Sequence, residues 1–467
     1  MYTRLRFMPL ILALLTVLLL INGTITSVNA AEEPLPWRAG LAKVVITPQE
    51  TMWMAGYAAR NKPAEGVVHD LYAKALVLKD SNSTTFILVT LDLISVPHPI
   101  RNHIEAHVNE KYNLPASALM INCSHTHCGP EIRTTRWSFD GLPSERLTIA
   151  KKYVEDLQSN ILKAIDNAMS SLQPSNVSYC RARCGFAMNR RTPSPTGYRN
   201  SPNPNGPVDH DVPVLKIQDM EGHLTGVVFG YACHNTTLGF YQFCGDYAGF
   251  AQQYLEEDFD GAIAMFVLGC GADQNPYPRG TLDLAKTHGR TLATAVKSAL
   301  GTTSIPISDQ LKHAYSKATL AYSTPPTKEE LVSRSNSSNK YIATHGKRLL
   351  QQLETDGMLR TTYDAPVQVV QLGKNLTLIA LPGETCVDYA LRLKAELIKT
   401  PAQQGSVWVA GYSNDVFAYV PSRRVLLEGG YEAGGAMKYF TTVLQHGPFA
   451  PDVEERLIKK VHDLLGN

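Results

Sequence analysis

The chain has 467 residues, a formal net charge of only +2, and a composition of 44% hydrophobic and 18% charged residues. This near balance of charge, without a basic stripe or a low-complexity tract, argues against nucleic acid as a partner. The length is enough to bury a large hydrophobic core and permits two or three domains. The composition is therefore that of an ordinary globular protein.

The first thirty residues predict an export signal. Arg4 and Arg6 precede an apolar run over residues 8–21, and the small residues around Ala30 suit an export peptidase. We expect residues 1–30 to be a signal peptide and the mature protein to be secreted or periplasmic. The alternative is an uncleaved membrane anchor, but the run is shorter than the ~20 residues that a spanning helix needs. No later segment is apolar enough to span a bilayer, so we expect no transmembrane segment after signal removal.

Hydrophobic periodicity predicts strands and helices that alternate along the mature chain. The predicted strands cover residues 85–94, 118–124, 177–184, 262–268 and 406–410, with hairpins over 212–233 and 367–380. The predicted helices cover 98–112, 144–172, 249–257, 282–300, 386–399 and 451–465. The pattern predicts an α/β fold of mixed β-sheet layers with flanking helices, because hairpins and crossovers both occur.

Two polar segments interrupt this pattern. Residues 189–207 are crowded with Pro, Asn, Ser and Arg, and residues 333–339 are almost entirely polar. Proline and glycine cannot extend a helix or a central strand. We therefore expect residues 189–207 to form a surface loop or lid, and 333–339 to be irregular.

His125 and His127 lie two residues apart, directly after the predicted strand 118–124. In an extended segment both imidazoles point to one face, where one could bind a divalent metal and the other could move protons beside it. A pair of histidines at this spacing also arises by chance, so the pattern needs support from elsewhere in the chain.

Other ligand-type side chains also follow apolar strands. His234, the turn that ends at Asp273, and the Pro382-Gly-Glu384 turn each come at the carboxyl end of a predicted strand. In α/β folds the loops at that edge converge and bind ligands. Each residue alone has a structural explanation, as a core histidine, a turn residue or a helix start. Together they predict a metal site at the carboxyl ends of the strands.

The chain has eight cysteines, which in an exported protein suggest disulfides whose pairing the sequence does not reveal. Cys180 and Cys184 lie in a predicted strand and would be about 13 Å apart, so we expect them not to pair. A second interpretation is a Cys/His zinc site, but the cysteine spacings match no compact zinc motif. Its candidate cysteines are Cys123, Cys128, Cys233 and Cys270.

Several short motifs occur in one order along the chain. They are Ile46-Thr-Pro48, Met54-Ala-Gly-Tyr57, Ser124-His-Thr-His-Cys-Gly-Pro130, Asn189-Arg190, Cys233-His-Asn-Thr-Thr-Leu238, Gly245-Asp-Tyr-Ala-Gly249, Gly271-Ala-Asp-Gln-Asn-Pro276, Pro382-Gly-Glu384 and Gly429-Gly-Tyr-Glu432. In this set and order the chain resembles the neutral/alkaline, non-lysosomal ceramidases, zinc-dependent amidases that hydrolyse the N-acyl bond of ceramide. The resemblance extends over nearly the whole mature chain.

The resemblance implies a zinc ion (Zn2+) bound by His125, His234, Glu384 and Tyr419. Tyr419 is chosen because it ends an Asn-x-x-x-x-Tyr segment similar to that of the family, and Tyr412 is the alternative ligand. Such an ion polarises an amide carbonyl and lowers the pKa of bound water.

The resemblance also implies roles beside the metal. His127 would transfer protons, and Arg190 and Tyr431 would hold the substrate and its developing oxyanion. Because Arg191 is adjacent to Arg190, the sequence leaves open which of the two arginines takes this role. We also assign Asp273 to substrate binding.

Two departures from the family pattern matter. Gly269 stands where the family's ceramidases carry a serine, so no serine role transfers, and Cys270 is the remaining candidate nucleophile in that turn. We also expect residues 31–467 to form one catalytic domain, without the C-terminal immunoglobulin-like domain of characterised members. Both departures bear on the choice of substrate, because one fold can host several.

The function expected from the sequence is an exported zinc amidohydrolase that cleaves an N-acyl amide bond. Its substrate would be a small amphipathic molecule, ceramide or a related N-acyl compound, accessible at a membrane surface. The alternatives are a metal-dependent hydrolase of another bond, such as a phosphoester or a carbohydrate amide, and a binding protein without turnover. The sequence gives no oligomeric state.

Overall fold

The largest sheet among the described residues has nine strands. The computed structural model describes residues 37–135, 143–308, 310–398, 405–440 and 442–466. Eight strands lie in one hydrogen-bonded order, and β14 (Ile305–Pro306) pairs with β6 beside it. In spatial order the eight are β12 (Ile263–Leu268), β10 (Leu224–Tyr231), β9 (Asp211–Gln218), β6 (Gln173–Arg183), β1 (Trp37–Val45), β3 (Tyr72–Lys79), β4 (Thr85–Leu91) and β5 (Leu119–Cys123).

A second sheet has four strands, and three smaller sheets have two or three strands each. The four are β15 (Leu311–Ala321), β16 (Thr362–Leu372), β17 (Leu376–Ala380) and β19 (Ser406–Ala410). The smaller sheets are β13 (Gln274–Pro276) with β7 (Ala187–Ser194) and β8 (Gly197–Asn203), β11 (Gln242–Phe243) with β2 (Gly66–Val67), and β18 (Glu384–Thr385) with β20 (Tyr419–Val420). Both larger sheets contain parallel and antiparallel pairs, which confirms the predicted mixed α/β class.

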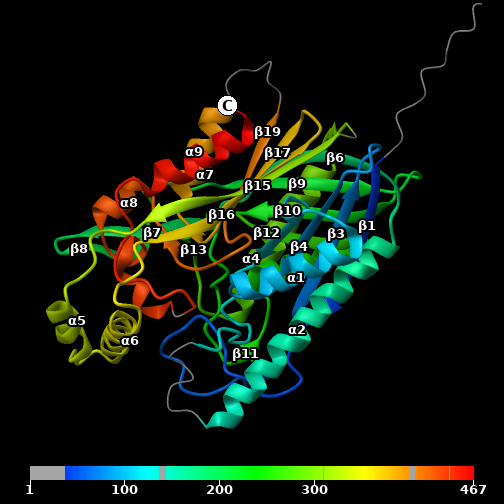
Figure 1. Ribbon diagram of the computed structural model, residues 1–467. Helices are drawn as coiled ribbons and strands as arrows, with labels where there is room; N and C mark the ends of the chain where they lie inside the picture. The colour runs from blue at the N-terminus through cyan, green and yellow to red at the C-terminus, as the bar shows by residue number, and fades with distance from the viewer. Residues whose placement is uncertain (1–36, 136–142, 309, 399–404, 441, 467) are drawn as a thin grey trace, which may run out of the picture. The chain divides into compact units, whose positions relative to one another are not determined.

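Helices cover the outer faces of both sheets (Figure 1). On the large sheet lie α1 (His98–Tyr112), α2 (Ser144–Ser170), α3 (Asp246–Asp258) and α4 (Leu282–Leu300). On the second sheet lie α7 (Val387–Leu397) and α9 (Val453–Leu465). The remaining helical segments are η1 (Ala116–Ala118), α5 (Lys328–Ser335), α6 (Lys340–Asp356), α8 (Arg423–Glu428), η3 (Tyr431–Gly435) and η4 (Met437–Tyr439). No helix in these described ranges combines the length and apolar content needed to cross a bilayer.

Strand alternation builds the layers. In β4, Ile87 and Val89 face the helices, whereas Phe86 and Leu88 face the second sheet. Successive side chains of a strand point to opposite faces, and a strand covered on both sides is apolar throughout. The inner faces of the two sheets share one core, which includes Trp408 of β19. The order of layers is therefore helix, sheet, sheet, helix.

The structure agrees with most of the predicted elements and corrects two segments. The helices predicted over 98–112 and 282–300 and the strand over 406–410 have the predicted bounds. Residues 189–207 are not a loop, because most of them form the hairpin β7–β8. Its prolines are tolerated because Pro202 lies on the edge strand and Pro193 is next to the turn.

The second correction concerns residues 333–339. Residues 333–335 are the end of α5, whereas 336–339 form the short non-helical connection to α6, so the prediction is wrong only for the first part. α5 runs to Ser335, and the Asn339 side chain accepts hydrogen bonds from the backbone N–H groups of Tyr341 and Ile342 at the start of α6. Such polar residues are favoured as helix caps. The predicted signal peptide, residues 1–30, lies outside the described residues.

One buried asparagine joins the two sheets where their strands end. Asn122 on β5 accepts a hydrogen bond from the Leu268 N–H of β12 at 2.9 Å and donates to the Leu268 carbonyl at 3.3 Å. It also donates to the Gly411 carbonyl, just after β19, at 2.8 Å. Asn122 is fully buried. The ends of β5, β12 and β19 are therefore held together by one amide.

We predict that Asn122→Leu destabilises the fold, because it leaves buried Leu268 and Gly411 backbone groups without partners. The expected loss in free energy of unfolding is about 2–4 kcal/mol. Chemical denaturation would measure this loss, and the slope of the unfolding free energy against denaturant concentration should not change. Asn109→Leu is the matched control, because Asn109 is exposed and donates one bond to the Leu114 carbonyl. Equal stability of the two variants would contradict the role of Asn122.

Candidate metal centre

The predicted ligand residues meet at the strand ends. His125 comes two residues after β5, His234 three residues after β10, and Glu384 begins β18 after β17. Glu384 and Tyr419 are register partners in the parallel pair β18–β20. His125 has a φ of 57°, in the left-handed region, so the chain turns sharply as it leaves β5. Four segments that are distant in sequence thus supply one site.

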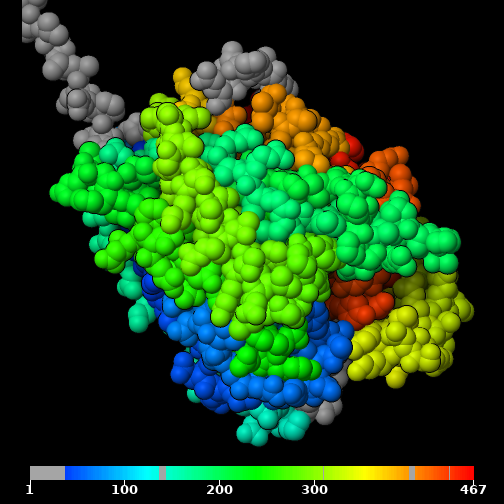
Figure 2. All heavy atoms as spheres, turned by 180° about the vertical axis from the view of Figure 1, so that it is seen from behind, coloured from blue at the N-terminus to red at the C-terminus, as the bar shows by residue number. Residues whose placement is uncertain are grey.

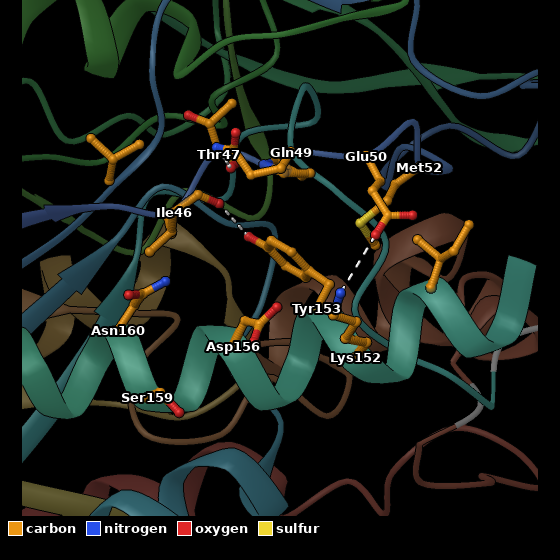
Figure 3. Close-up of a pocket in the computed structure, with 13 residues that line it drawn as sticks. Ile46, Thr47, Gln49, Glu50, Met52, Lys152, Tyr153, Asp156, Ser159 and Asn160 are labelled. Carbon is orange, nitrogen blue, oxygen red and sulfur yellow. Dashed lines mark hydrogen bonds and ion pairs between the residues drawn. The ribbon is translucent and has the colours of Figure 1, made fainter.

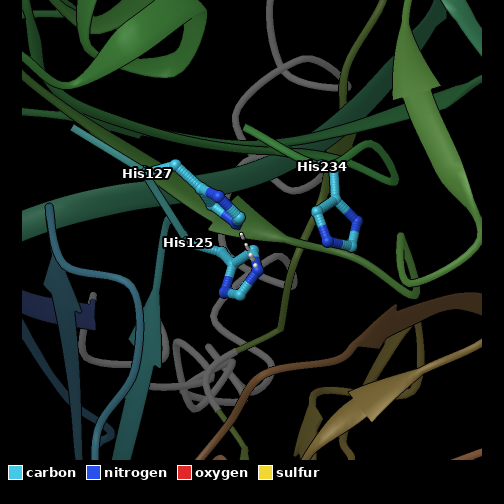
Figure 4. A group of neighbouring side chains, drawn as sticks. All are labelled: His125, His127 and His234. Atoms are coloured by element: carbon cyan, nitrogen blue, oxygen red, sulfur yellow. Dashed lines mark hydrogen bonds between the residues drawn. The ribbon is translucent and has the colours of Figure 1, made fainter. Parts of the chain in front are cut away.

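Three imidazoles form the centre of the site (Figure 4). One ring nitrogen from each of His125, His127 and His234 lies within 4.8 Å of the others. The Nε2 atoms of His125 and His127 are 3.1 Å apart. Spacing from the sequence therefore predicted the proximity of His125 and His127 correctly, and the fold adds His234 from another strand.

Oxygen ligands approach the same point. Glu384 Oε2 lies 3.2 Å from His125 Nε2 and 3.3 Å from His234 Nε2. The Tyr419 hydroxyl lies 3.2 Å from His234 Nε2. The Tyr412 hydroxyl is 3.4 Å from Glu384 Oε2, so both candidate tyrosines border the site. The choice of Tyr419 over Tyr412 as a ligand stays a prediction.

The outer hydrogen bonds distinguish the three histidines. His125 Nδ1 is 2.6 Å from the Ile94 carbonyl, and His234 Nδ1 is 2.7 Å from the Gly271 carbonyl. A carbonyl only accepts, so each Nδ1 carries the proton, and in the neutral ring the Nε2 lone pair faces Glu384. Metal-binding histidines are commonly held in this way. In the part of the chain that the structure describes, His127 Nδ1 has no hydrogen-bond partner, so His127 lacks the support that the other two have.

This donor set fits a cation. Two Nε2 lone pairs and a carboxylate oxygen converge without a proton between them in the neutral tautomers, an arrangement that a positive ion would neutralise. Burial, together with the nearby charge of Arg190, lowers the pKa of His234 to about 3. Burial would raise the pKa of Glu384, but His125 and His234 hold it well below its usual range. Neutral imidazole and ionised carboxylate are the metal-binding forms.

The pKa of His127 is also lowered well below its usual range. Burial is the main cause, and the neighbouring His125 and His234 rings add to it. At neutral pH the ring is therefore uncharged and has a lone pair available for a proton. With its Nδ1 unbonded, His127 is suited to proton transfer rather than to metal binding.

Arg190 reaches the site, whereas Arg191 does not. Arg190 on β7 is buried and donates to the Tyr419 hydroxyl at 3.1 Å and to Glu432 at 2.9 Å. Arg191 points to Glu428 and to the other Glu432 oxygen. Adjacent residues of a strand point to opposite sides. Of the two arginines between which the sequence left the choice open, Arg190 is therefore the one that faces the site.

Tyr431 lies at the outer end of the site. Its ring centroid is 5.3 Å from that of Tyr419, and the side chain is 39% exposed. In the space-filling view from behind, the red-orange segment that carries Tyr431 is framed by the green hairpin β7–β8 and the yellow helices α5 and α6 (Figure 2). The structure thus brings Arg190 and Tyr431 to one side of the metal centre.

Asp273 is not part of the histidine cluster. It accepts a hydrogen bond from the Val387 N–H, at the start of α7, at 2.9 Å, and another from Asn189 at 3.2 Å. The side chain is fully buried, and burial raises its pKa to about 6. These contacts hold β7 and α7 in place beside the site. Substrate binding by Asp273 stays a prediction.

All eight cysteines are free thiols and buried, so the expectation of disulfides is wrong. The expectation that Cys180 and Cys184 do not pair is confirmed. No cysteine belongs to a possible metal-binding group among the described residues, which gives the Cys/His zinc site no support. Cys270 is fully buried, and burial raises its pKa to about 12.

The sequence interpretation missed the residues that surround His127. Gly56 has a φ of 102°, and a Cβ there would lie 2.4 Å from the His127 ring. The Tyr57 ring packs on His127 with centroids 4.8 Å apart, and Arg60 donates to the His127 carbonyl at 2.7 Å. The motif Met54-Ala-Gly-Tyr57 was the available signal, but nothing in its sequence connects it to His127.

A separate groove of about 340 Å³ runs along α2 (Figure 3). It lies between the segment after β1 and the helix, where the Tyr153 hydroxyl donates to the Ile46 carbonyl. None of the site residues described above lines it. No histidine in the described ranges lines this groove, so it is separate from the candidate metal centre.

Comparisons with known proteins identify the family of the chain. The sequence profile described as Neutral/alkaline non-lysosomal ceramidase, N-terminal, matches residues 37–307. The neutral ceramidase of Pseudomonas aeruginosa is 24% identical over 259 residues, or 51% of this chain and 37% of that protein. Neutral ceramidase B of Dictyostelium discoideum is 26% identical over 246 residues, or 49% of this chain and 33% of that protein. The chain thus spans well under two thirds of the length of these relatives.

A solved structure gives the same fold. The crystal structure of the P. aeruginosa neutral ceramidase aligns with a TM-score of 0.70 at 19% identity, over 92% of this chain and 74% of that chain. The class of protein is therefore a layered α/β fold with a histidine-rich centre at the ends of its strands. Because the profile matches more than half of the sequence, the chain belongs to the neutral/alkaline non-lysosomal ceramidase family, which confirms the resemblance seen in its motifs.

We predict that His234→Ala and Glu384→Ala each lose most of the bound metal. Removal of a direct ligand should weaken binding by more than the roughly 10–100-fold that loss of a supporting hydrogen bond costs. Elemental analysis of purified protein measures this. His223→Ala is the control, because His223 belongs to an exposed Asp219/Glu221/His223 group on a hairpin turn. Full metal retention in both site variants would exclude this ligand set.

Proposed function

We propose that the chain is an exported zinc-dependent amidohydrolase that cleaves the N-acyl bond of ceramide or of a related amphipathic amide. The observation that carries this proposal is the convergence of His125, His234 and Glu384, with His127 beside them and without an outer hydrogen bond. Export rests on residues 1–30, which have the composition of a signal peptide. Family membership supports the choice of an amide substrate.

Zinc suits these donors better than a hard cation. Two imidazoles, one carboxylate and one phenol form a mixed nitrogen and oxygen set, whereas magnesium and calcium prefer oxygen ligands throughout. His125, His234, Glu384 and Tyr419 would hold the ion. When bound, zinc would polarise the amide carbonyl and increase the acidity of water. Arg190, through its hydrogen bond to the Tyr419 hydroxyl, would stabilise the phenolate form of that ligand.

Proton transfer falls to His127. Hydrolysis adds the oxygen of water to the acyl carbon and a proton to the departing nitrogen. A neutral imidazole accepts the proton that water loses and then donates it to the amine. The low pKa of His127 keeps its ring in the accepting form at neutral pH. Tyr431, at the outer end of the site, would donate its hydroxyl hydrogen to the oxyanion that forms on the acyl group.

No covalent acyl-enzyme is required. Gly269 has no side-chain nucleophile, and the Cys270 thiol stays protonated because burial raises its pKa to about 12. The Thr385 hydroxyl, 3.4 Å away, donates to the Cys270 sulfur and fixes it inside the turn. Direct attack by water is therefore the simplest route for this chain.

We predict that a panel of fluorescent N-acyl sphingoid bases and other N-acyl amides is hydrolysed, and that a chelator abolishes turnover. Added zinc should restore it, because the ligands are neutral imidazoles and a carboxylate. Phosphoester and N-acetylated sugar substrates are tested in parallel. Turnover only on one of those, or metal binding without turnover on any substrate, would contradict amide hydrolysis and favour the other hydrolase or a binding protein.

We predict that His127→Ala retains the metal but loses about 10²–10⁴-fold in kcat, the usual contribution of a proton-transfer group. Tyr431→Phe should also keep the metal and lose kcat, because only a hydroxyl donor is removed. Steady-state kinetics together with elemental analysis measure both effects. Loss of metal in His127→Ala but not in His125→Ala would mean that the two histidines have exchanged roles.

A further inference from the structure

Arg60 is a buried arginine without an acidic partner. Its side chain is 8% exposed, and no carboxylate in the part of the chain that the structure describes forms an ion pair with it. Its guanidinium lies over the Tyr57 ring at 5.0 Å and the Tyr241 ring at 5.9 Å. A buried charge without a counterion is unfavourable, and aromatic faces offset only part of that cost.

The hydrogen bonds of Arg60 connect three separate segments. Nη1 donates to the carbonyl of Ala55 and, at 2.7 Å, to that of His127. Nη2 donates to the Phe240 carbonyl at 2.9 Å. A planar guanidinium with five N–H donors can bridge several acceptors in fixed directions, which a lysine cannot do. The contacts therefore explain why an arginine, rather than another cation, fits this place.

One of these segments packs against the His127 ring, and a second supports it. The Ala55–Arg60 loop brings Gly56 and Tyr57 into contact with it, and the Tyr57 hydroxyl donates to the Leu238 carbonyl at 2.9 Å, close to Phe240. The His127 backbone N–H makes only a long contact of 3.4 Å with the Asn235 carbonyl. Among the described residues His127 Nδ1 has no hydrogen-bond partner and Nε2 lies 3.1 Å from His125 Nε2, so the ring is placed by its backbone, by the His125 ring and by this packing.

We propose that Arg60 is a positioning residue for His127: it joins the Ala55–Arg60 loop, the His127 backbone and Phe240, and thereby holds the His127 ring against the metal centre. The proposal rests on the proposed function, in which His127 transfers protons. Arg60 touches neither the ligand atoms nor Glu384, so it acts only through His127. A displacement of about 1 Å in a reacting group can cost about 10²-fold in rate.

The test is a double-mutant cycle between Arg60 and His127. Arg60→Lys keeps the charge but loses the planar fork whose two nitrogens reach the three carbonyls in fixed directions, and it should lower kcat for a short-chain N-acyl amide by about 10–100-fold with KM and metal content unchanged. In the His127→Ala background the same substitution should have no further effect, because the group that it positions is gone. Arg38→Lys is the matched control, since Arg38 is exposed and donates to one carbonyl, that of Leu172.

An equal loss in both backgrounds, or no loss of kcat in Arg60→Lys, would overturn the proposal. A general loss of structure would instead lower the melting temperature and the metal content together. If Arg60→Lys does not fold, Tyr57→Leu replaces it in the cycle, because the Tyr57 ring packs on both Arg60 and His127, and the same non-additivity is expected. Full activity of His127→Ala alone would refute the proposed function rather than the role of Arg60.

Discussion

The site depends on the junction at Asn122, where strands from two sheets end at one point. Its amide satisfies both backbone groups of Leu268 and the Gly411 carbonyl inside the protein. Such groups are costly to bury without partners, so the junction has little freedom to shift. The segments that leave it carry His125 and Tyr412, and the neighbouring strand ends supply His234 and Glu384. The side chains of the candidate metal centre are therefore held in fixed positions, because the backbone that carries them has little freedom to shift.

Two kinds of support surround the three histidines. Backbone carbonyls fix the rings of His125 and His234 through Nδ1 and leave the opposite nitrogens facing Glu384. His127 has no such bond and is instead confined by Gly56, Tyr57 and the Arg60 contact to its carbonyl. In His127 the Nε2 atom lies 3.1 Å from His125 Nε2 and the Nδ1 side of the ring lies against Gly56, whereas in His125 and His234 one nitrogen is committed to a carbonyl. Within this single cluster, His125 and His234 therefore have a different kind of support from His127.

Buried charge is balanced locally around the site. Glu432 lies between Arg190 and Arg191, and Arg190 also contacts the Tyr419 hydroxyl. This arrangement links the hairpin β7–β8 to the segment that carries Tyr431. Glu432, which is adjacent to Tyr431 in the chain, is therefore connected through charged hydrogen bonds of Arg190 to Tyr419 at the candidate metal centre.

The sequence by itself determined the main elements and the residue types of the site. Apolar periodicity located helices such as 98–112, and the spacing of His125 and His127 indicated the candidate metal centre, although the two rings meet across a turn at His125 and not on the extended segment that the spacing predicted. The hairpin within 189–207 was missed because its prolines disfavour a central strand, and only the pairing of β7 with the distant β13 shows that β8 is an edge strand. Only the tertiary structure decided that Arg190 rather than Arg191 faces Tyr419, that Asp273 supports α7, and that Arg60 holds His127. These contacts join residues that are remote in the chain, and no local pattern encodes which carbonyl a buried guanidinium will meet.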